Sequence, residues 1–191
     1  MALFLWYNCF IKEGEVFLIY IVRHGETDWN VLGRIQGRQD IELNENGIKQ
    51  ALSLKEKFKN INIDKVFSSP LKRATQTAKI ITDRKDIIID KRLIERDNGL
   101  LEGKVKKEIK EMPNFNDIND TKYGVESLES IKNRLDSFYN EILKKYPNQN
   151  ILIVTHAGVG IYTKCFFVGE PKDNNYLSYK LKNGEVWAFK N

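Results

Sequence analysis

The two histidines of the chain lie in matching sequence contexts. His24 follows the apolar run "EVFLIYIV" and Arg23, and His156 follows the run "ILIVT" directly. Each is followed by a turn of small residues, "HGET" and "HAGVG". A continuous apolar run is typical of a strand covered on both faces, and ligands of open α/β sheets bind beyond the carboxyl ends of the strands. We therefore expect one site that contains both histidines, where the adjacent glycines let the backbone approach a ligand closely.

Two kinds of chemistry fit these residues poorly. A metal centre normally requires a third or fourth ligand, and the sequence places no carboxylate or thiolate cluster at ligand spacing. A serine hydrolase requires an exposed nucleophile turn, and "SSP" (68–70) lacks the flanking glycines of such a turn. The hydroxyls of Ser68 and Ser69 are instead candidates for contacts with phosphate.

The arginines near the predicted strand ends favour phosphate. Arg23 adjoins His24, and Arg73 lies in "SSPLKRATQTA", between a predicted strand and the start of a predicted helix. A guanidinium binds phosphate oxygens in a bidentate manner, and a helix N-terminus adds backbone donors. Histidine flanked by arginines therefore predicts phosphoryl transfer to an imidazole nitrogen.

The elements that must position these residues alternate along the chain. The hydrophobic patterns predict strands at 16–22, 65–69, 86–90 and 151–155, and helices at 44–60, 71–82, 125–146 and 159–167. This alternation predicts an α/β fold, a three-layer α/β/α sandwich with a mainly parallel sheet. The tail "YLSYKLKNGEVWAFK" predicts a C-terminal hairpin around Asn183-Gly184.

Two of the helices are amphipathic. The first has Asn44 as its expected N-cap. The inward positions are expected to be Ile48, Ala51, Leu52 and Phe58 in the first helix, and Leu128, Ile131, Leu135, Phe138 and Ile142 in the helix at 125–146. The segment from about 103 to 125 is polar and poorly periodic, so we expect a mobile or lid-like insertion there.

Length and composition favour one domain. The chain has 191 residues, of which 41% are hydrophobic, and we expect a single domain at 16–191 preceded by an apolar arm or extra strand at 1–15. No apolar stretch approaches the roughly 18 residues of a membrane span, and the opening lacks the basic segment and cleavage site of a signal peptide. Cys9 and Cys165 are too few for a disulfide framework or a metal site. We therefore expect a cytoplasmic protein that contacts no membrane.

The charge excess is small and interleaved. Lys and Arg number 31 against 26 Asp and Glu, a net charge of +5. Stretches such as "KEKFKNINIDK" mix both signs, which is typical of a solvated helix face, and no nucleic-acid recognition motif is present. The positive field favours a small anionic substrate as the partner.

The ordered set of motifs resembles the histidine phosphatase superfamily, which includes the cofactor-dependent phosphoglycerate mutases. "VRHGET" with Asn30, "RIQGRQDIELNENG", "SSPLKRATQTA", "LIERDNGLLEG", "GVES" and "THAG" occur in the family's order. The resemblance runs from about residue 16 to the C-terminus and implies the phosphoglycerate mutase-like fold.

The resemblance also implies roles for individual residues. His24 would be the nucleophile that forms a phosphohistidine, and Glu95 would protonate the leaving oxygen and later activate water. Arg23, Arg73 and His156 would hold the phosphoryl oxygens, with a further hydrogen bond from Asn30. Gln36, Gly37 and Ala157 would line the substrate site. The neighbouring arginines would keep His24 neutral by lowering its pKa, and burial or a nearby carboxylate would raise the pKa of Glu95.

Within the superfamily, the compact length resembles the broad phosphatases and alpha-ribazole phosphatases. The predicted function is therefore hydrolysis of a small phosphomonoester, without metal or cofactor, by a monomer or a homodimer. A cofactor-dependent phosphoglycerate mutase is the alternative, although mutases usually carry a longer basic segment where this chain has "EGKVKKEIKEMPNFNDIND". A non-catalytic module that binds a phosphorylated ligand is a third alternative.

Overall fold

The computed structural model describes residues 16–113, 120–173 and 175–191. The arm expected at 1–15, with Cys9, lies outside these residues. The described strands form one five-stranded sheet in the order β3-β2-β4-β1-β5. Their bounds are β1 Leu18–Arg23, β2 Lys65–Ser68, β3 Ile88–Ile89, β4 Ile151–Thr155 and β5 Val186–Lys190. Strand β5 pairs antiparallel with β1, and the other pairings are parallel, which confirms the mainly parallel sheet.

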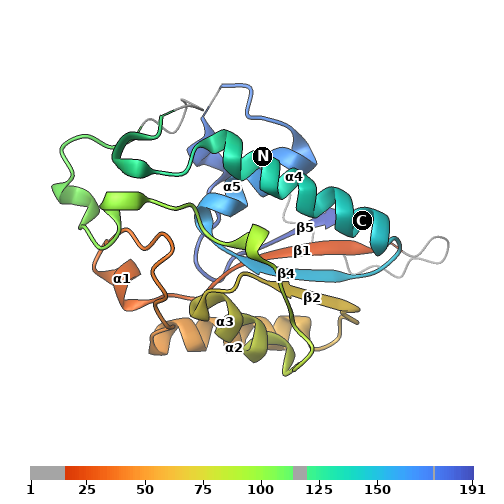
Figure 1. The fold of residues 1–191 in the computed structure, drawn as a ribbon. Coiled ribbons are helices and arrows are strands. Elements are labelled where there is room, and N and C mark those ends of the chain that lie inside the picture. The colour runs from red at the N-terminus through yellow and green to blue at the C-terminus, as the bar shows by residue number, and fades with distance from the viewer. Residues whose placement is uncertain (1–15, 114–119, 174) are drawn as a thin grey trace.

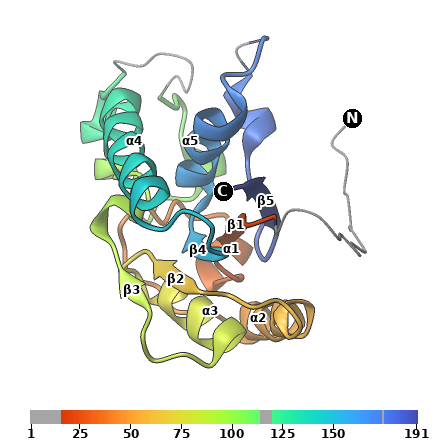
Figure 2. The ribbon, with the colours of Figure 1, turned by 90° about the vertical axis from the view of Figure 1, so that its right-hand side faces the viewer.

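Helices cover both faces of the sheet, as the three-layer prediction requires (Figures 1 and 2). Helices α2 (Glu45–Phe58) and α3 (Lys72–Thr82) lie on one face, and α4 (Leu128–Lys145) and α5 (Ala157–Val168) lie on the other. A short helix α1 (Asp28–Val31) follows β1. The short 3-10 turns are η1 Lys91–Leu93, η2 Gly99–Leu101, η3 Lys106–Glu108, η4 Lys122–Gly124 and η5 Tyr176–Tyr179. None of the helices in the described ranges is long and apolar enough to cross a membrane.

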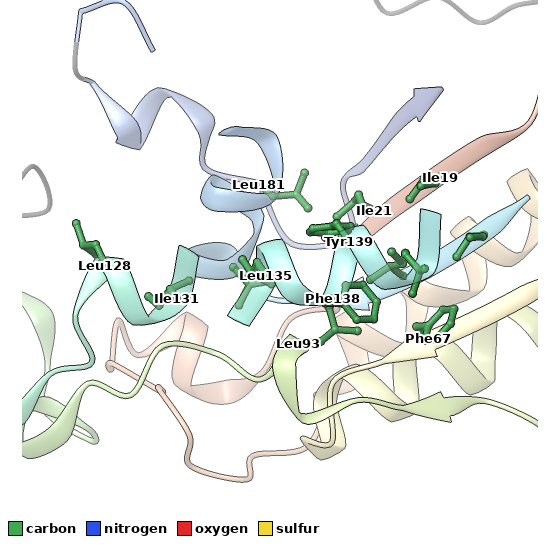
Figure 3. Close-up of a cluster of buried hydrophobic side chains, with 14 residues drawn as sticks. Ile19, Ile21, Phe67, Leu93, Leu128, Ile131, Leu135, Phe138, Tyr139 and Leu181 are labelled. Carbon is green, nitrogen blue, oxygen red and sulfur yellow. The ribbon is translucent and has the colours of Figure 1, made fainter. Parts of the chain in front are cut away.

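The strands divide their side chains between two cores because successive residues point to opposite faces. Ile19 and Ile21 of β1 pack toward α4 and α5, whereas Val22 packs toward α2 and α3. Strand β4 is buried along its whole length, which explains why its sequence is apolar without alternation. Figure 3 shows the α4 side of the core, where all five predicted inward residues of that helix are buried.

The predicted inward face of α2 was partly wrong. Asn44 is the N-cap, since its side chain accepts a hydrogen bond from the Gly47 N–H, and Ala51 and Phe58 are buried. Ile48 and Leu52, however, are 43% and 48% exposed. The buried positions recur at 47, 51, 54 and 58, so the two exposed residues lie about 100° further round the helix.

The predicted C-terminal hairpin was also wrong. Only β5 is a strand, and the first expected arm is the 3-10 turn η5 followed by the fully buried Leu181. Strand β5 finds its partner in β1 instead. Gly184 still makes the turn with a φ of +65°, but the turn leads from the core into the sheet edge.

The polar segment expected between 103 and 125 has little regular structure where it is described. It contains η3 and η4, and it is tied back to the preceding loop by the Arg34–Val105 bridge. Its mobility stays a prediction.

Candidate active site

The parallel pairing of β1 with β4 brings the two histidines together. Arg23 lies opposite Thr155 in the register, and the His24 N–H donates to the Thr155 carbonyl at 3.0 Å. The ring centroids of His24 and His156 are 5.1 Å apart. Their exposed fractions are 2% and 0%. The two histidines therefore lie next to each other at the carboxyl ends of two neighbouring strands, as expected.

His24 is held as one tautomer. Its Nδ1 lies 2.7 Å from the Gly25 carbonyl oxygen, which can only accept, so Nδ1 carries the proton and Nε2 keeps the lone pair of the neutral ring. Burial lowers the pKa of His24 well below its usual value, and the charges of Arg73 and Arg23 lower it further, against the Gly25 bond. The expected neutral imidazole is thus explained first by burial and only second by the arginines.

His156 has one ring nitrogen, Nδ1, without a hydrogen-bond partner among the described residues. Its Nε2 lies 2.7 Å from the Ser69 hydroxyl, whereas Nδ1 is buried. Burial, followed by Arg73 and His24, lowers the pKa of His156 well below normal. If the neutral ring accepts from Ser69 at Nε2, its Nδ1–H is free to donate to an anion.

The serines therefore do not act as the sequence analysis expected. Ser69 directs its hydroxyl to His156, and Ser68 donates its hydroxyl to the Ser69 carbonyl. Both are fully buried. Ser69 thus orients the second histidine, and Ser68 contacts the Ser69 backbone.

Arg73 is buried without a carboxylate partner among the described residues. Its exposed fraction is 1%, and its Nη1 and Nη2 donate to the carbonyls of Gln39 and Gly37, both at 2.7 Å. Nε has no partner in the same part of the chain. Burial lowers the pKa of Arg73 to about 10, so it stays charged at neutral pH. The loop bonds fix the guanidinium and leave Nε–H and one proton on each Nη for a ligand.

The loop that holds Arg73 requires glycine at position 37. Gly37 has a φ of +52°, and a Cβ there would lie 1.9 Å from Oε1 of Glu102. That carboxylate in turn accepts from the backbone N–H groups of Arg38 and Asn98. Gln36 is nearly buried, and its Oε1 has no partner within the described ranges.

Arg23 repeats the pattern on the other side of His24. Its Nη1 donates to the Leu181 carbonyl at 3.0 Å, and its buried Nε has no partner in the described chain. Asn30 lies in the first helical turn after His24, where it forms a capping box with Thr27. Its Oδ1 is occupied by donors, and no described group accepts from its Nδ2.

Glu95 lies at the N-terminus of α5. Its carboxylate accepts from the backbone N–H groups of Arg96, Gly158 and Val159 at 2.9, 3.2 and 3.3 Å. The negative charge of Glu95 acts to raise the pKa values of Arg23 and Arg73, so the carboxylate lies within electrostatic reach of both guanidinium groups. Three backbone donors therefore hold this carboxylate at the start of α5.

Two contacts show how the backbone near these residues is used. The first N–H of α3, on Lys72, donates to Asp40 at 2.7 Å and is not free for phosphate. A Cβ on Gly25 would lie 2.5 Å from the Gly47 carbonyl oxygen. Glycine after the nucleophile candidate therefore allows the loop to pack on α2. Ala157 begins α5 directly after His156 and is half-buried.

Sequence reasoning missed the contacts by which three residues support this site. Ser69 orients His156, Glu102 holds the loop at 37–39, and Asn183 contacts the backbone of His24. Glu102 lies within the quoted motif "LIERDNGLLEG", which was a usable signal. Asn183 was seen only as a turn residue, because its side-chain contacts are 153 or more positions distant in sequence.

The arrangement suits an anion bound next to a neutral imidazole. Unpartnered nitrogens of Arg23, Arg73 and His156 surround His24. Within the described ranges, no group of three His, Cys, Asp or Glu side chains is placed to hold a metal ion.

Comparison with known proteins gives a consistent result. A family model described as the histidine phosphatase superfamily (branch 1) matches residues 19–189. A metal-independent phosphoserine phosphatase of Arabidopsis thaliana is 38% identical over 168 residues, covering 82% of this chain and 71% of that protein. A probable phosphoglycerate mutase GpmB of Proteus mirabilis is 37% identical over 151 residues, covering 73% and 69%. The crystal structure of a phosphoserine phosphatase from Entamoeba histolytica, in complex with 3-phosphoglyceric acid, matches with a TM-score of 0.77 and 29% identity, covering 90% of this chain and 89% of that one.

Proposed function

Because the chain belongs to the histidine phosphatase superfamily (branch 1), we propose that it hydrolyses small phosphomonoesters through a phosphohistidine on His24. One observation carries this proposal. The Gly25 carbonyl takes the proton of Nδ1, so Nε2 keeps its lone pair beside the unpartnered nitrogens of Arg23 and Arg73.

In the first step, Nε2 of His24 forms a bond to phosphorus while the bond from phosphorus to the ester oxygen breaks. Arg23, Arg73 and His156 donate to the phosphoryl oxygens as charge spreads over them, which is where fixed donors lower a barrier most. Glu95 gives its proton to the departing oxygen, which leaves as an alcohol.

In the second step, water takes the place of the alcohol. Glu95 removes a proton from the water, whose oxygen bonds to phosphorus while the phosphorus–nitrogen bond breaks. Inorganic phosphate leaves, and Nε2 regains its lone pair. Glu95 again holds one proton, so the cycle closes.

The substrate itself can supply the proton that Glu95 donates. A phosphomonoester has a second pKa near 6, and the bound phosphoryl charge stabilises a protonated carboxyl nearby. A substrate monoanion can therefore pass its proton to Glu95 on binding. We therefore predict a mildly acidic pH optimum for hydrolysis.

The substrate class that we favour carries a carboxylate near the phosphate, and phosphoserine is the first candidate. The name of the Arabidopsis relative supports it, as does the name of the Entamoeba structure. Lys180 supports it as well, because partial burial and the like charges of Lys106 and Arg23 lower its pKa. Neither lysine has an ion-pair partner among the described residues, so both ammonium groups are available to a second anionic group.

The test is to trap the intermediate and to compare substrates. Brief incubation with ³²P-labelled phosphoserine and an alkaline quench should leave acid-labile label on the wild type and none on His24→Ala. Label on His24→Ala would remove the assignment. Phosphate release from a panel of phosphoesters, with and without chelator, should favour carboxylate-bearing esters and survive chelation. Activity lost in chelator and restored by a divalent ion would contradict metal independence.

A mutase is the second candidate, favoured by the similarity to the Proteus mirabilis protein. The same panel separates the two activities. Interconversion of phosphoglycerates that requires catalytic bisphosphoglycerate would identify a mutase, whereas release of inorganic phosphate without it identifies a phosphatase. The cytoplasmic location and the monomeric or homodimeric state stay predictions.

A further inference from the structure

The turn before β5 reaches back to the nucleophile. Asn183 donates from Nδ2 to the His24 carbonyl at 3.0 Å, to the Gly25 carbonyl at 3.3 Å and to Oδ1 of Asn30 at 3.3 Å. The backbone of the turn makes a parallel contact, since the Gly184 N–H donates to the Arg23 carbonyl at 3.3 Å. One half-buried amide therefore joins three acceptors on the segment that carries the nucleophile.

The first consequence concerns the tautomer of His24. The Gly25 carbonyl that accepts from His24 Nδ1 also accepts from Asn183, and the His24 carbonyl accepts from the same amide. Asn183 thereby fixes the direction of the carbonyl that takes the imidazole proton. With that carbonyl fixed, the lone pair stays on Nε2 and points away from Gly25.

The second consequence concerns the amide of Asn30. Its Oδ1 accepts from the Thr27 N–H at 3.1 Å, from the Thr27 hydroxyl at 3.0 Å and from Asn183. An amide whose oxygen accepts from several donors is held in one of its two flipped orientations. The Nδ2 of Asn30 is then on the opposite side, where it can donate to a bound anion.

We propose that Asn183 is a positioning residue for phosphoryl transfer. It sets the tautomer of His24 through the Gly25 carbonyl and the orientation of Asn30 through Oδ1, without itself contacting the phosphoryl group. The effect on rate rests on the proposed function, whereas the effect on the tautomer does not.

The experiment uses Asn183→Ala and Asn183→Asp in the full chain, with Lys182→Ala as the matched control. Lys182 lies in the same turn and is exposed. Asn183→Asp keeps the size of the side chain but removes the donor and places a carboxylate beside three acceptor oxygens. It also serves if the alanine variant folds poorly, and near-ultraviolet circular dichroism establishes the fold of each variant.

The first readout is the ¹⁵N spectrum of imidazole-labelled protein. The chain contains only two histidines, so each tautomer can be assigned with His24→Ala as a reference. We expect the wild type and Lys182→Ala to show His24 protonated at Nδ1 alone, and both Asn183 variants to show a mixture. This readout does not depend on any activity.

The second readout is the single-turnover rate of His24 phosphorylation by an aryl phosphate. Loss of the Asn183 bonds should slow this step about tenfold, as expected for about 1.4 kcal/mol of positioning, with Lys182→Ala unchanged. When Asn183→Ala is introduced into Asn30→Ala, the fold-decrease in the phosphorylation rate should be at least threefold smaller than when it is introduced into the wild type.

The outcomes separate the two proposals. The role of Asn183 would be overturned if the His24 tautomer were unchanged in both variants and if Asn183→Ala slowed phosphorylation by the same factor in the wild type and in Asn30→Ala. A wild type that forms no phosphohistidine would overturn the proposed function, and the tautomer alone would then decide this inference.

Discussion

Two groups of charged residues in this protein differ in how their charges are paired. At the carboxyl ends of β1 and β4, Arg23, Arg73 and Glu95 form no ion pair with any described residue, although opposite charges lie within electrostatic reach. Along α4, charged side chains form two groups of ion pairs, which a hydrogen bond from Arg134 to the Arg92 carbonyl connects. Their members, here called the α4 network, are Arg38, Asp90, Arg92, Asp97, Glu126, Arg134 and Glu141.

The difference in charge pairing distinguishes an arginine that can bind a ligand, Arg73, from one that stabilises the fold, Arg92. Arg73 donates to neutral carbonyls and keeps an unpartnered Nε, and burial lowers its pKa. Arg92 instead donates to Asp90 and Glu141, and these bonds raise its pKa. A buried cation without a countercharge is costly to the fold, so its presence indicates that an anionic ligand supplies the missing charge. Substitutions at the site should therefore cost activity, and substitutions in the α4 network should cost stability.

The largest expected effect is on Glu95, whose carboxylate accepts from backbone N–H groups and pairs with no cation among the described residues. Glu95→Gln should slow His24 phosphorylation by about 10²–10⁴-fold with an alkyl phosphate, because an alkoxide needs a proton to leave. Para-nitrophenolate departs without much help, so the loss with that ester should be far smaller. Single-turnover measurements are needed because water activation also slows. Equal losses with both esters would mean that Glu95 is not the proton donor.

The sequence predicted those features that a local pattern encodes. The spacing of Leu128, Ile131 and Leu135 fixes the inward face of α4, and the run "ILIVT" marks a strand buried on both sides. The ordered motifs named the candidate site residues that the fold then brings together at the strand ends.

The predictions that were wrong concern features that depend on contacts between residues distant in sequence. Ile48 and Leu52 are apolar, yet α2 buries positions 47, 51, 54 and 58 instead, and the close approach of Gly47 to Gly25 is a contact that no local pattern reveals. The Asn183-Gly184 pair predicted the turn correctly. It predicted the wrong partner for the strand that follows, because β5 pairs with β1 and not with the segment before the turn. The donors on Glu95 come from α5, so its electrostatics could not be predicted from the charged stretch around it.

The second expected effect is a pH dependence of the free energy of unfolding, which tests whether burial of the two site histidines destabilises the fold at low pH. The pKa values of His24 and His156 are lowered in the folded protein, so the unfolded chain binds more protons once the pH falls below about 6.5. The free energy of unfolding should therefore decrease as the pH falls from 7.5 to 5.5, by about 1.4 kcal/mol per histidine. Urea unfolding at both pH values measures this.

His24→Gln and His156→Gln serve as controls for that pH dependence. Each should remove about half of it, because these two are the only histidines in the chain. A pH dependence that is unchanged in the double variant would mean that other groups carry it.

The third effect concerns Arg73, whose guanidinium is fixed by two loop carbonyls. Arg73→Lys keeps the charge and loses the planar donor geometry, so turnover should fall about tenfold or more. The free energy of unfolding should fall by no more than about 1–3 kcal/mol, the cost of weakening the two buried hydrogen bonds to the Gln39 and Gly37 carbonyls. Steady-state kinetics and urea unfolding of the same preparation measure both quantities. Near-normal turnover in a folded variant would return Arg73 to a purely structural role.

The smallest effect is expected at Arg92, the counterpart of Arg73 in the α4 network. Its side chain is 26% exposed, pairs with Asp90 at 2.7 Å and Glu141 at 2.8 Å, and lies over the Phe138 ring. Arg92→Gln should change turnover by less than about twofold and lower the free energy of unfolding by about 1 kcal/mol, since solvent screens part of these interactions. That loss should shrink in 1 M salt, where exposed pairs are screened further. If Arg92→Gln instead lowers turnover as much as Arg73→Lys and leaves stability unchanged, the pairing of an arginine does not distinguish structural from ligand-binding roles in this protein.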